Sequence, residues 1–449
     1  MRSMSVNARR IILSVVAVLA LAAAAPAGAA TWGTPATLAG PGDVNSSVAV
    51  GSNGTAAIAY VANGVRVAVR NPGGRWGTPV RVSQGGYNVT GPSVAVDGRG
   101  GIIVAWTQDG NPRGGGLVRG PLTIRTIIRA RSGVWGTVHQ IGTSSHFIEA
   151  GAHVAANGAG EAIVVWNGVQ QLSGSRRTQA VQSSFRRAGK AFGGAQTIRE
   201  PEAPRGISGA VVAIDGGGSA YAAWTNDVNG PIVRIATRSR GGSGSWGTAR
   251  TIGPKQSSNP VIAVTPDRTA IVAWHQAGVD SEGNGLQVGA LMSAQRLPTG
   301  GTLTAPQQVS ATKTRAYSLA VARSGEAMLA FNADPDASVP QSQTTVLHVA
   351  VRPAAGGAFG AEQEVPGTDP GQYGGALTYL ADGAALYVWG AGDGAVRSVA
   401  RPAGGAFGTP EPVTAKGLYP RVGASGNTAV AVWSVASGDS VRIATADRR

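Results

Sequence analysis

A hairpin-like stretch that recurs eight times constrains the fold of this chain more than any other feature. Its clearest copy, residues 91–106, reads GPSVAVDGRGGIIVAW: an apolar run, an Asp-Gly turn and a second apolar run that ends on Trp. This pattern is typical of a β-hairpin. Variants of a second marker, Trp-Gly-Thr-Pro at residues 76–79, stand between the copies. Such recurrence predicts a repeat architecture in which each unit packs against its neighbours.

Two columns of large side chains run through the repeats, with members 44 to 60 residues apart. All ten Trp residues fall in these columns, so we interpret them as architectural side chains packed between neighbouring sheets rather than as sugar-stacking residues. The first column is Trp32, Trp76, Trp135, Phe192, Trp246, Leu303, Phe359 and Phe407, and the second is Tyr60, Trp106, Trp166, Trp224, Trp274, Phe331, Trp389 and Trp433.

Each repeat contains four runs of strand length, exemplified by residues 76–82, 94–96, 103–106 and 65–70. Gly-rich turns separate the runs, and no helical period follows residue 30. We therefore predict an all-β fold, an eight-bladed β-propeller with four antiparallel strands per blade. The repeats begin with the segment 32–38 and end after the segment 441–445. This phase predicts that the N-terminal strand completes the last blade and closes the ring.

The first thirty residues have the features of a secretory signal peptide. Arg2, Arg9 and Arg10 precede an apolar run from 11 to 25, and a small-residue tail follows. We expect cleavage after Ala30, by either Sec or twin-arginine export, and a single propeller domain over 31–449. The expected product is secreted, extracellular or associated with the cell wall, and has no membrane span once the signal is removed. There is no Cys, which excludes disulfides and thiolate metal sites.

The basic charge is concentrated in one part of the sequence. The chain carries a net charge of +15, and residues 110–199 hold eleven Lys and Arg against two acids. Long connections at 107–122, 167–177, 275–285 and 332–343 would gather on one face of a propeller, where variable loops usually bind ligands. The candidate ligand-binding residues there are Arg113, Arg119, Arg176, Arg177 and His275. The alternative reading is that the basic residues only keep the protein soluble.

Arginine also recurs in the last run of the repeat. One column contains Arg66, Arg125, Arg234, Arg397 and Arg442, and a second, four residues on, contains Arg70, Arg129, Arg238, Arg352 and Arg401. Two interpretations stay open. The arginines stack on aromatic rings of a neighbouring blade, or they line a repeated pocket between blades for an acidic or hydroxylated ligand.

The search for catalytic and metal-binding patterns finds no match. The five His residues have no metal-binding spacing, and we expect no metal and no cofactor. Glu149 and Glu161 do not define a glycosidase carboxylate pair. Catalytic residues are therefore unassigned.

The turns before the Trp marker, residues 71–76 and 241–246, resemble the Asp-box of sialidase-like propellers in their Gly spacing and closing aromatic, without the Asp. The chain is therefore similar to the sialidase and BNR-repeat propeller superfamily. The resemblance implies a propeller fold and a relation to carbohydrates. Family sialidases have six blades and use an arginine triad, a Tyr–Glu nucleophile pair and an Asp acid, and no motif here matches those parts.

Taken together, these features favour an exported, non-catalytic propeller that binds a glycan or an acidic cell-surface polymer through loops on one face. A sialidase-like exo-glycosidase and a scaffold for another exported protein remain alternatives. We expect a monomer. Nucleic-acid binding is not expected, because the arginines alternate with strand residues and lack free aromatic neighbours.

Overall fold

The computed structural model describes residues 30–42, 46–85, 87–112, 122–144, 151–171, 177–200, 206–227, 230–240, 244–279, 285–298, 301–310, 314–333, 345–437 and 440–448. The chain divides into a segment, residues 1–31, and a compact unit, residues 32–449. The described part of the compact unit consists of β-strands, turns and irregular segments, with no helix. None of the described residues therefore forms a helix that could cross a membrane.

The described residues form eight blades of four strands, and we name each blade by its innermost strand. The first four blades contain β2 (Ser46–Val50), β3 (Ala56–Val61), β4 (Val65–Arg70) and β5 (Val80–Arg81); β6 (Tyr87–Val96), β7 (Ile102–Pro112), β8 (Leu122–Arg129) and β9 (His139–Ser144); β10 (His153–Ala156), β11 (Ala162–Gln171), β12 (Arg177–Arg186) and β13 (Gln196–Thr197); β14 (Gly206–Ile214), β15 (Ala220–Asp227), β16 (Pro231–Arg238) and β17 (Arg250–Thr251).

The other four blades contain β18 (Ser257–Val264), β19 (Ala270–Val279), β20 (Gly285–Arg296) and β21 (Gln307–Gln308); β22 (Thr314–Val321), β23 (Ala327–Ala333), β24 (Val346–Arg352) and β25 (Gln363–Glu364); β26 (Pro370–Tyr379), β27 (Ala385–Ala391), β28 (Val396–Arg401) and β29 (Glu411–Thr414); β30 (Leu418–Ser425), β31 (Thr428–Ser437), β32 (Ser440–Arg448) and β1 (Ala36–Gly42).

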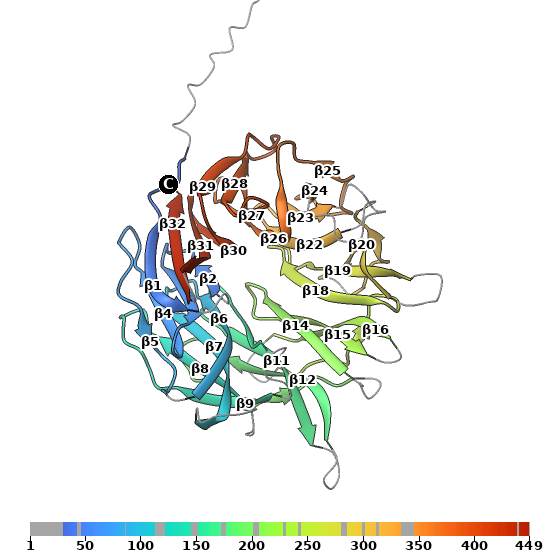
Figure 1. Ribbon diagram of the computed structural model, residues 1–449. Helices are drawn as coiled ribbons and strands as arrows, with labels where there is room; N and C mark the ends of the chain where they lie inside the picture. Colours follow the sequence, from blue (N-terminus) through green and yellow to red (C-terminus); the bar gives the residue numbers. More distant parts are fainter. Residues whose placement is uncertain are drawn as a thin grey trace, which may run out of the picture. The chain divides into compact units, whose positions relative to one another are not determined.

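The blades are arranged in a ring around a central axis (Figure 1). Each innermost strand contacts the innermost strands of both neighbouring blades, and the sequence of contacts from β2 through β30 returns to β2. Within every blade the paired strands are antiparallel. The predicted eight-bladed β-propeller is therefore confirmed.

The ring closes through the first strand of the compact unit. β1 pairs antiparallel with β32, with Ala36 opposite Thr445 and Thr37 opposite Ala444. An additional bridge joins Trp32 to Arg448. The N-terminal strand thus completes the last blade, as the phase of the repeat predicts, and it covers a strand edge that would otherwise be free.

The two aromatic columns occupy different depths of the blades. The second column lies in the second strand of each blade, and all eight of its members are 0% exposed. They join clusters shared by neighbouring blades, as Trp106 does with residues of the β2 blade. In the first column the four Trp residues Trp32, Trp76, Trp135 and Trp246 are only partly buried. Apolar packing between blades therefore depends mainly on the second column.

Several strands are longer than their sequence pattern indicates. β7, β11 and β19 continue past the buried Trp into segments expected to be loops. Thr107 and Asn167, the residues that follow Trp106 and Trp166, are almost completely buried. The extension could not be predicted from the sequence, because polar residues follow the Trp and end the apolar run.

Candidate functional site

The end of the third strand of every blade carries an arginine. Sequence analysis found five of these residues, and the strand register adds Arg186, Arg296 and Arg448. Seven of the eight lie opposite the first residue of the second strand, and Arg448 lies opposite Ala429, the second residue of β31. The column is Arg70, Arg129, Arg186, Arg238, Arg296, Arg352, Arg401 and Arg448.

Most arginines of this column bind the preceding blade in the ring. Four form ion pairs with acids of that blade: Arg401 with Glu326 at 2.7 Å, Arg70 with Asp447 at 2.6 Å, Arg448 with Glu411 at 3.1 Å, and Arg186 with Asp97 at 3.9 Å. Arg238 instead lies over the Phe185 ring, 3.9 Å from its centroid, and Arg352 donates to the Gln295 side chain. These arginines connect neighbouring blades, so their first role is architectural.

The interface between the β14 and β18 blades is different. Its column arginine, Arg296, contacts the preceding blade through the ring of Tyr221, 5.5 Å from guanidinium carbon to centroid. Among the described residues the Arg296 guanidinium makes no hydrogen bond or ion pair. A pocket of about 640 Å³ opens at this interface, within the size range of ligand sites. We call it the arginine pocket.

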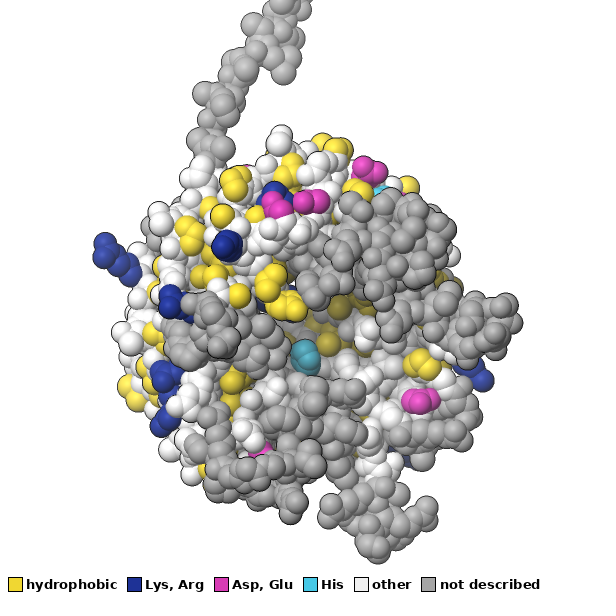
Figure 2. Space-filling view, viewed as in Figure 1, with side chains coloured by type: hydrophobic (Ala, Val, Ile, Leu, Met, Phe, Trp, Pro, Cys, Tyr) yellow, Lys and Arg dark blue, Asp and Glu magenta, His cyan; other side chains and the backbone are white. Residues whose placement is uncertain are grey.

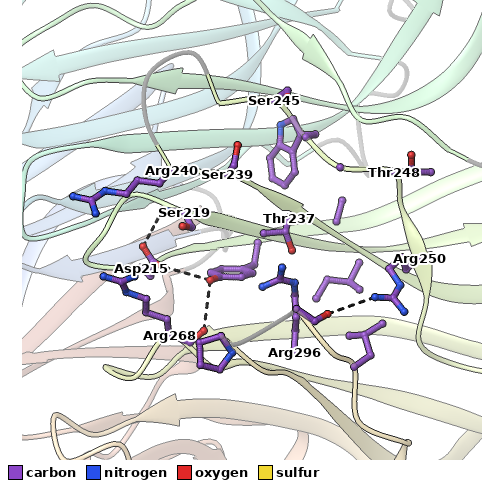
Figure 3. Close-up of a pocket in the computed structure, with 18 residues that line it drawn as sticks. Asp215, Ser219, Thr237, Ser239, Arg240, Ser245, Thr248, Arg250, Arg268 and Arg296 are labelled. Atoms are coloured by element: carbon purple, nitrogen blue, oxygen red, sulfur yellow. Dashed lines mark hydrogen bonds between the residues drawn. The ribbon is translucent and has the colours of Figure 1, made fainter.

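Four arginines and one acid line the arginine pocket (Figure 3). Arg296 points toward its centre, and Arg268 and Arg250 lie on either side. Arg240 lies at its edge. Hydroxyl groups and apolar side chains complete the wall: Ser219, Thr237, Ser239, Ser245, Thr248, Ile235, Trp246 and Leu303.

The single acid in the wall, Asp215, is committed to local structure. It is 1% exposed, and its Oδ1 accepts hydrogen bonds from the backbone N–H groups of Gly217 and Ser219. The Tyr221 hydroxyl donates to its Oδ2 over 3.3 Å. Burial, reinforced by the Asp215 charge, raises the pKa of Tyr221 above its ordinary value, which keeps this hydroxyl protonated. The accessible charge in the pocket is therefore that of the arginines.

Arg268 reaches the pocket from a backbone conformation that favours glycine. Its φ is 68°, and its N–H closes a tight turn onto the Thr265 carbonyl. Six other blades have glycine in this position: Gly54, Gly100, Gly160, Gly218, Gly325 and Gly383. A non-glycine residue pays about 1 kcal/mol for this conformation. Strain retained at one blade out of seven points to a role for the side chain, because the fold itself is satisfied by glycine there.

The chemistry of the arginine pocket is recognition of negative charge. Guanidinium groups donate paired hydrogen bonds to carboxylate, sulfate or phosphate, and none of the four in this pocket forms an ion pair with an acid among the described residues. Hydrolysis of a glycosidic bond by two carboxylates is not supported in this pocket, where Asp215 is the one described carboxylate. No group of three His, Asp or Glu side chains among the described residues could hold a metal ion.

None of the ligand residues predicted from the sequence is among the described residues that line the arginine pocket. Arg113, Arg119 and Arg176 fall outside the described residues, and Arg177 begins β12 with a side chain that is also outside them. His275 lies inside β19, opposite Ser258, and is 6% exposed. Burial lowers its pKa below the ordinary value near 6.5, so the ring is neutral at pH 7. It does not line the arginine pocket, and these residues remain predictions.

The arginines of the pocket were missed for identifiable reasons. Arg296 could have been found, since it stands seven residues before Leu303 of the marker column, as Arg352 stands before Phe359. Arg268 was available as a signal, since residues 265–269 read TPDRT where other repeats have glycine at the fourth position. Arg240 and Arg250 come from segments that only the folded blades bring together.

Comparison with known proteins identifies the fold. No protein-family model matches the sequence, and no curated protein matches it either. Among solved structures, the BP39L lectin from Burkholderia pseudomallei is similar with a TM-score of 0.53 and 15% identity, over 84% of this chain and 100% of the lectin. The polysaccharide lyase Uly1 has a TM-score of 0.49 and 12% identity, over 78% of this chain and 88% of its own.

A sialidase from Trypanosoma rangeli is more distant, with a TM-score of 0.41 and 9% identity, over 92% of this chain and 59% of the sialidase. At these identities the likeness is one of fold. The propeller fold that the resemblance of the turns to the Asp-box implied is confirmed.

Proposed function

We propose that this protein is an exported binding propeller that holds an acidic glycan, or another acidic polymer, in the arginine pocket. The observation that carries the proposal is that the column arginine at the β14/β18 interface pairs with no acid among the described residues. The column arginine that meets an acid at four other interfaces meets only an aromatic ring among the described residues here, and three more arginines surround it. One of the solved propellers of similar fold is a lectin, which accords with this proposal.

The pocket suits a sugar acid better than a bare ion. Its volume exceeds what a single sulfate or carboxylate fills, and its wall mixes the guanidinium groups with the partly buried Trp246 ring and several hydroxyls. An apolar ring face packs against the faces of sugars, while hydroxyls exchange hydrogen bonds with sugar hydroxyls. The Trp246 indole N–H is already bonded to the Ser183 hydroxyl at 2.7 Å, so the ring is held in place.

The pocket does not lie on the face expected from the sequence. The turn of Arg268 joins the first and second strands of a blade, and Arg296 precedes the connection between the third and fourth. In an antiparallel blade both connections lie on the face opposite the blade-to-blade crossovers. Binding by the long loops of the crossover face therefore stays a separate prediction.

The test is binding of the purified protein to immobilised heparin and polygalacturonate, with neutral dextran beside them. We expect both acidic polymers to bind at low salt, dextran not to bind, and the affinity to fall steeply as salt screens the arginines. Arg268→Gln and Arg250→Gln should each weaken binding about tenfold, as loss of a charged hydrogen bond implies. Arg131→Gln is the matched control, since Arg131 is exposed and outside the pocket.

Failure of both acidic polymers to bind at low salt would contradict the proposal, as would equal losses for Arg268→Gln and Arg131→Gln. Turnover of a fluorogenic sialoside would instead favour the glycosidase alternative, and selective capture of another exported protein would favour the scaffold. Export itself is tested by N-terminal sequencing of protein from the medium, where we expect the mature chain to begin at Thr31.

A further inference from the structure

A second pocket lies at the centre of the ring, and one repeated position of the innermost strands defines it. In each blade this position is the innermost-strand residue that pairs with the residue directly before the buried aromatic of the second strand. In ring order it is occupied by Ser47, Ser93, His153, Val211, Val261, Ser318, Ala376 and Arg421. We call these eight residues the axial ring.

The serines of the axial ring have an architectural role. The hydroxyl oxygens of Ser47, Ser93 and Ser318 each accept a hydrogen bond from a backbone N–H of the next blade, over 3.1–3.2 Å. This bond satisfies a backbone donor on the inner edge of the neighbouring strand. The serines at this position therefore have a structural role, because they connect adjacent blades.

His153 and Arg421 do not have that explanation. The His153 side chain makes no hydrogen bond with a described residue, and among those residues the Arg421 side chain donates only to the backbone carbonyl of Pro420, at 3.1 Å. Both side chains are exposed to a pocket of about 490 Å³ at the start of the innermost strands, which we call the axial pocket. Figure 2 shows a histidine side chain beside the depression at the centre of the ring.

Four of the five polar members of the axial ring are gathered on one side. Arg421, Ser47, Ser93 and His153 belong to four consecutive blades and all line the axial pocket. The fifth, Ser318, belongs to the other side with Val211, Val261 and Ala376, and none of these four lines the pocket. A channel that served only to close the ring would not require this asymmetry. It gives the pocket one wall of hydrogen-bonding groups within reach of a single small ligand.

The described groups on that wall are mainly donors. Ser47 and Ser93 use an oxygen lone pair toward the backbone, so each hydroxyl can still donate its proton. The exposed guanidinium of Arg421 supplies a positive charge, and no acid is among the described lining residues. Surrounding protein lowers the pKa of His153 below its ordinary value near 6.5 even though the ring meets solvent, so at pH 7 it is neutral and donates one N–H.

We propose that the axial pocket binds a hydroxylated monocarboxylate of monosaccharide size, with its carboxylate on Arg421 and its hydroxyl groups on His153, Ser47 and Ser93. One guanidinium matches one carboxylate in a paired geometry. The volume is large enough for a single sugar-sized molecule. The inference is separate from the arginine pocket, which lies between two blades and away from the axis.

The experiment is calorimetric titration of the full protein with D-glucuronate, and with D-glucose as a ligand of the same shape without the carboxylate. We expect glucuronate to bind with at least tenfold higher affinity than glucose. Arg421→Gln should reduce the glucuronate affinity about tenfold or more, Arg421→Lys should lose less because the charge remains, and His153→Gln should lose a few fold. Arg131→Gln serves as the matched control.

Equal affinity for the two sugars, no measurable glucuronate binding, or unchanged affinity in both Arg421 variants would overturn the inference. Thermal unfolding of each variant shows whether it is folded, and Arg421→Lys keeps the test valid if Arg421→Gln is not. The polymer assay is read in parallel. If the protein binds the polymers but not glucuronate, the axial site alone is contradicted. If it binds glucuronate but not the polymers, only the arginine pocket is contradicted.

Discussion

The arginine at one repeat position is paired with an acid at one interface of the propeller and has no acid partner among the described residues at another. At the β22/β26 interface, Arg401 pairs with Glu326 at 2.7 Å, and Tyr379 donates to the same carboxylate oxygen at 2.8 Å. At the β14/β18 interface, Arg296 occupies the equivalent position and faces an open pocket. The comparison teaches that one repeated residue is structural where an acid meets it and available to a ligand where none does.

The origin of the difference is a single position in the preceding blade. Glu326 directly precedes Ala327, the first residue of β23, and Ser219 directly precedes Ala220, the first residue of β15. The two positions are equivalent in the repeat. At these two interfaces, a carboxylate at this position pairs with the arginine of the following blade, and a hydroxyl leaves that arginine without an acid among the described residues.

The largest expected effect is on stability at the paired interface. Arg401→Gln would leave the Glu326 carboxylate, only 21% exposed, without its cationic partner. Since both groups are partly open to solvent, we expect a loss of about 2 kcal/mol in the free energy of unfolding, below the cost of breaking a fully buried pair. Urea unfolding measures it, and polymer binding should be unchanged. A loss as small as that of Arg131→Gln would mean that the pair is not structural.

The same substitution at the unpaired interface should have the reverse outcome. Arg296→Gln removes a cation–π contact worth about 1 kcal/mol or less, so the unfolding free energy should change little. Polymer binding should fall about tenfold, because the central guanidinium is lost. Heparin binding and urea unfolding of the two arginine variants, measured side by side, give the comparison its sharpest form. Equal changes in heparin affinity and in unfolding free energy for the two variants would contradict the claim that the two arginines have different roles.

The smallest effect concerns the strained turn. Arg268→Gly restores the residue found at this turn in six other blades, where φ is also positive. We expect the unfolding free energy to rise by up to about 1 kcal/mol as the strain is relieved, while heparin affinity falls severalfold. A variant that loses stability would show that the Arg268 side chain supports the fold. One that keeps full affinity would remove Arg268 from the site.

The fold could be predicted from the sequence because every repeat contains the same order of apolar runs, turns and aromatic residues. The aromatic columns recur eight times, so errors in one copy are corrected by the others, and the phase of the first and last segments shows how the ring closes. The site could not be predicted in the same way. The arginine pocket depends on Arg268, where one blade departs from the repeat, and on Ser219 of the preceding blade, and its wall is assembled from segments between Asp215 and Leu303.

The candidate residues taken from charge density illustrate the same limit. A stretch rich in arginine, such as residues 110–199, indicates a positive field but not which guanidinium groups remain free of partners. Arg186, for example, lies in that stretch and donates to two backbone carbonyls, those of Lys190 and Gly160. Availability depends on neighbours across blades, and these are known only once the blades are assembled.

The most direct test of the account is the heparin affinity of Ser219→Glu, with Ser219→Gln as a control of the same size. The glutamate would stand toward Arg296 as Glu326 stands toward Arg401, so it should pair with that arginine and fill the role of the ligand. We predict that Ser219→Glu loses at least tenfold in affinity without losing stability, while Ser219→Gln stays within a few fold of the wild type. Equal affinities for the two variants would contradict the claim that an unpaired arginine makes this interface a binding site.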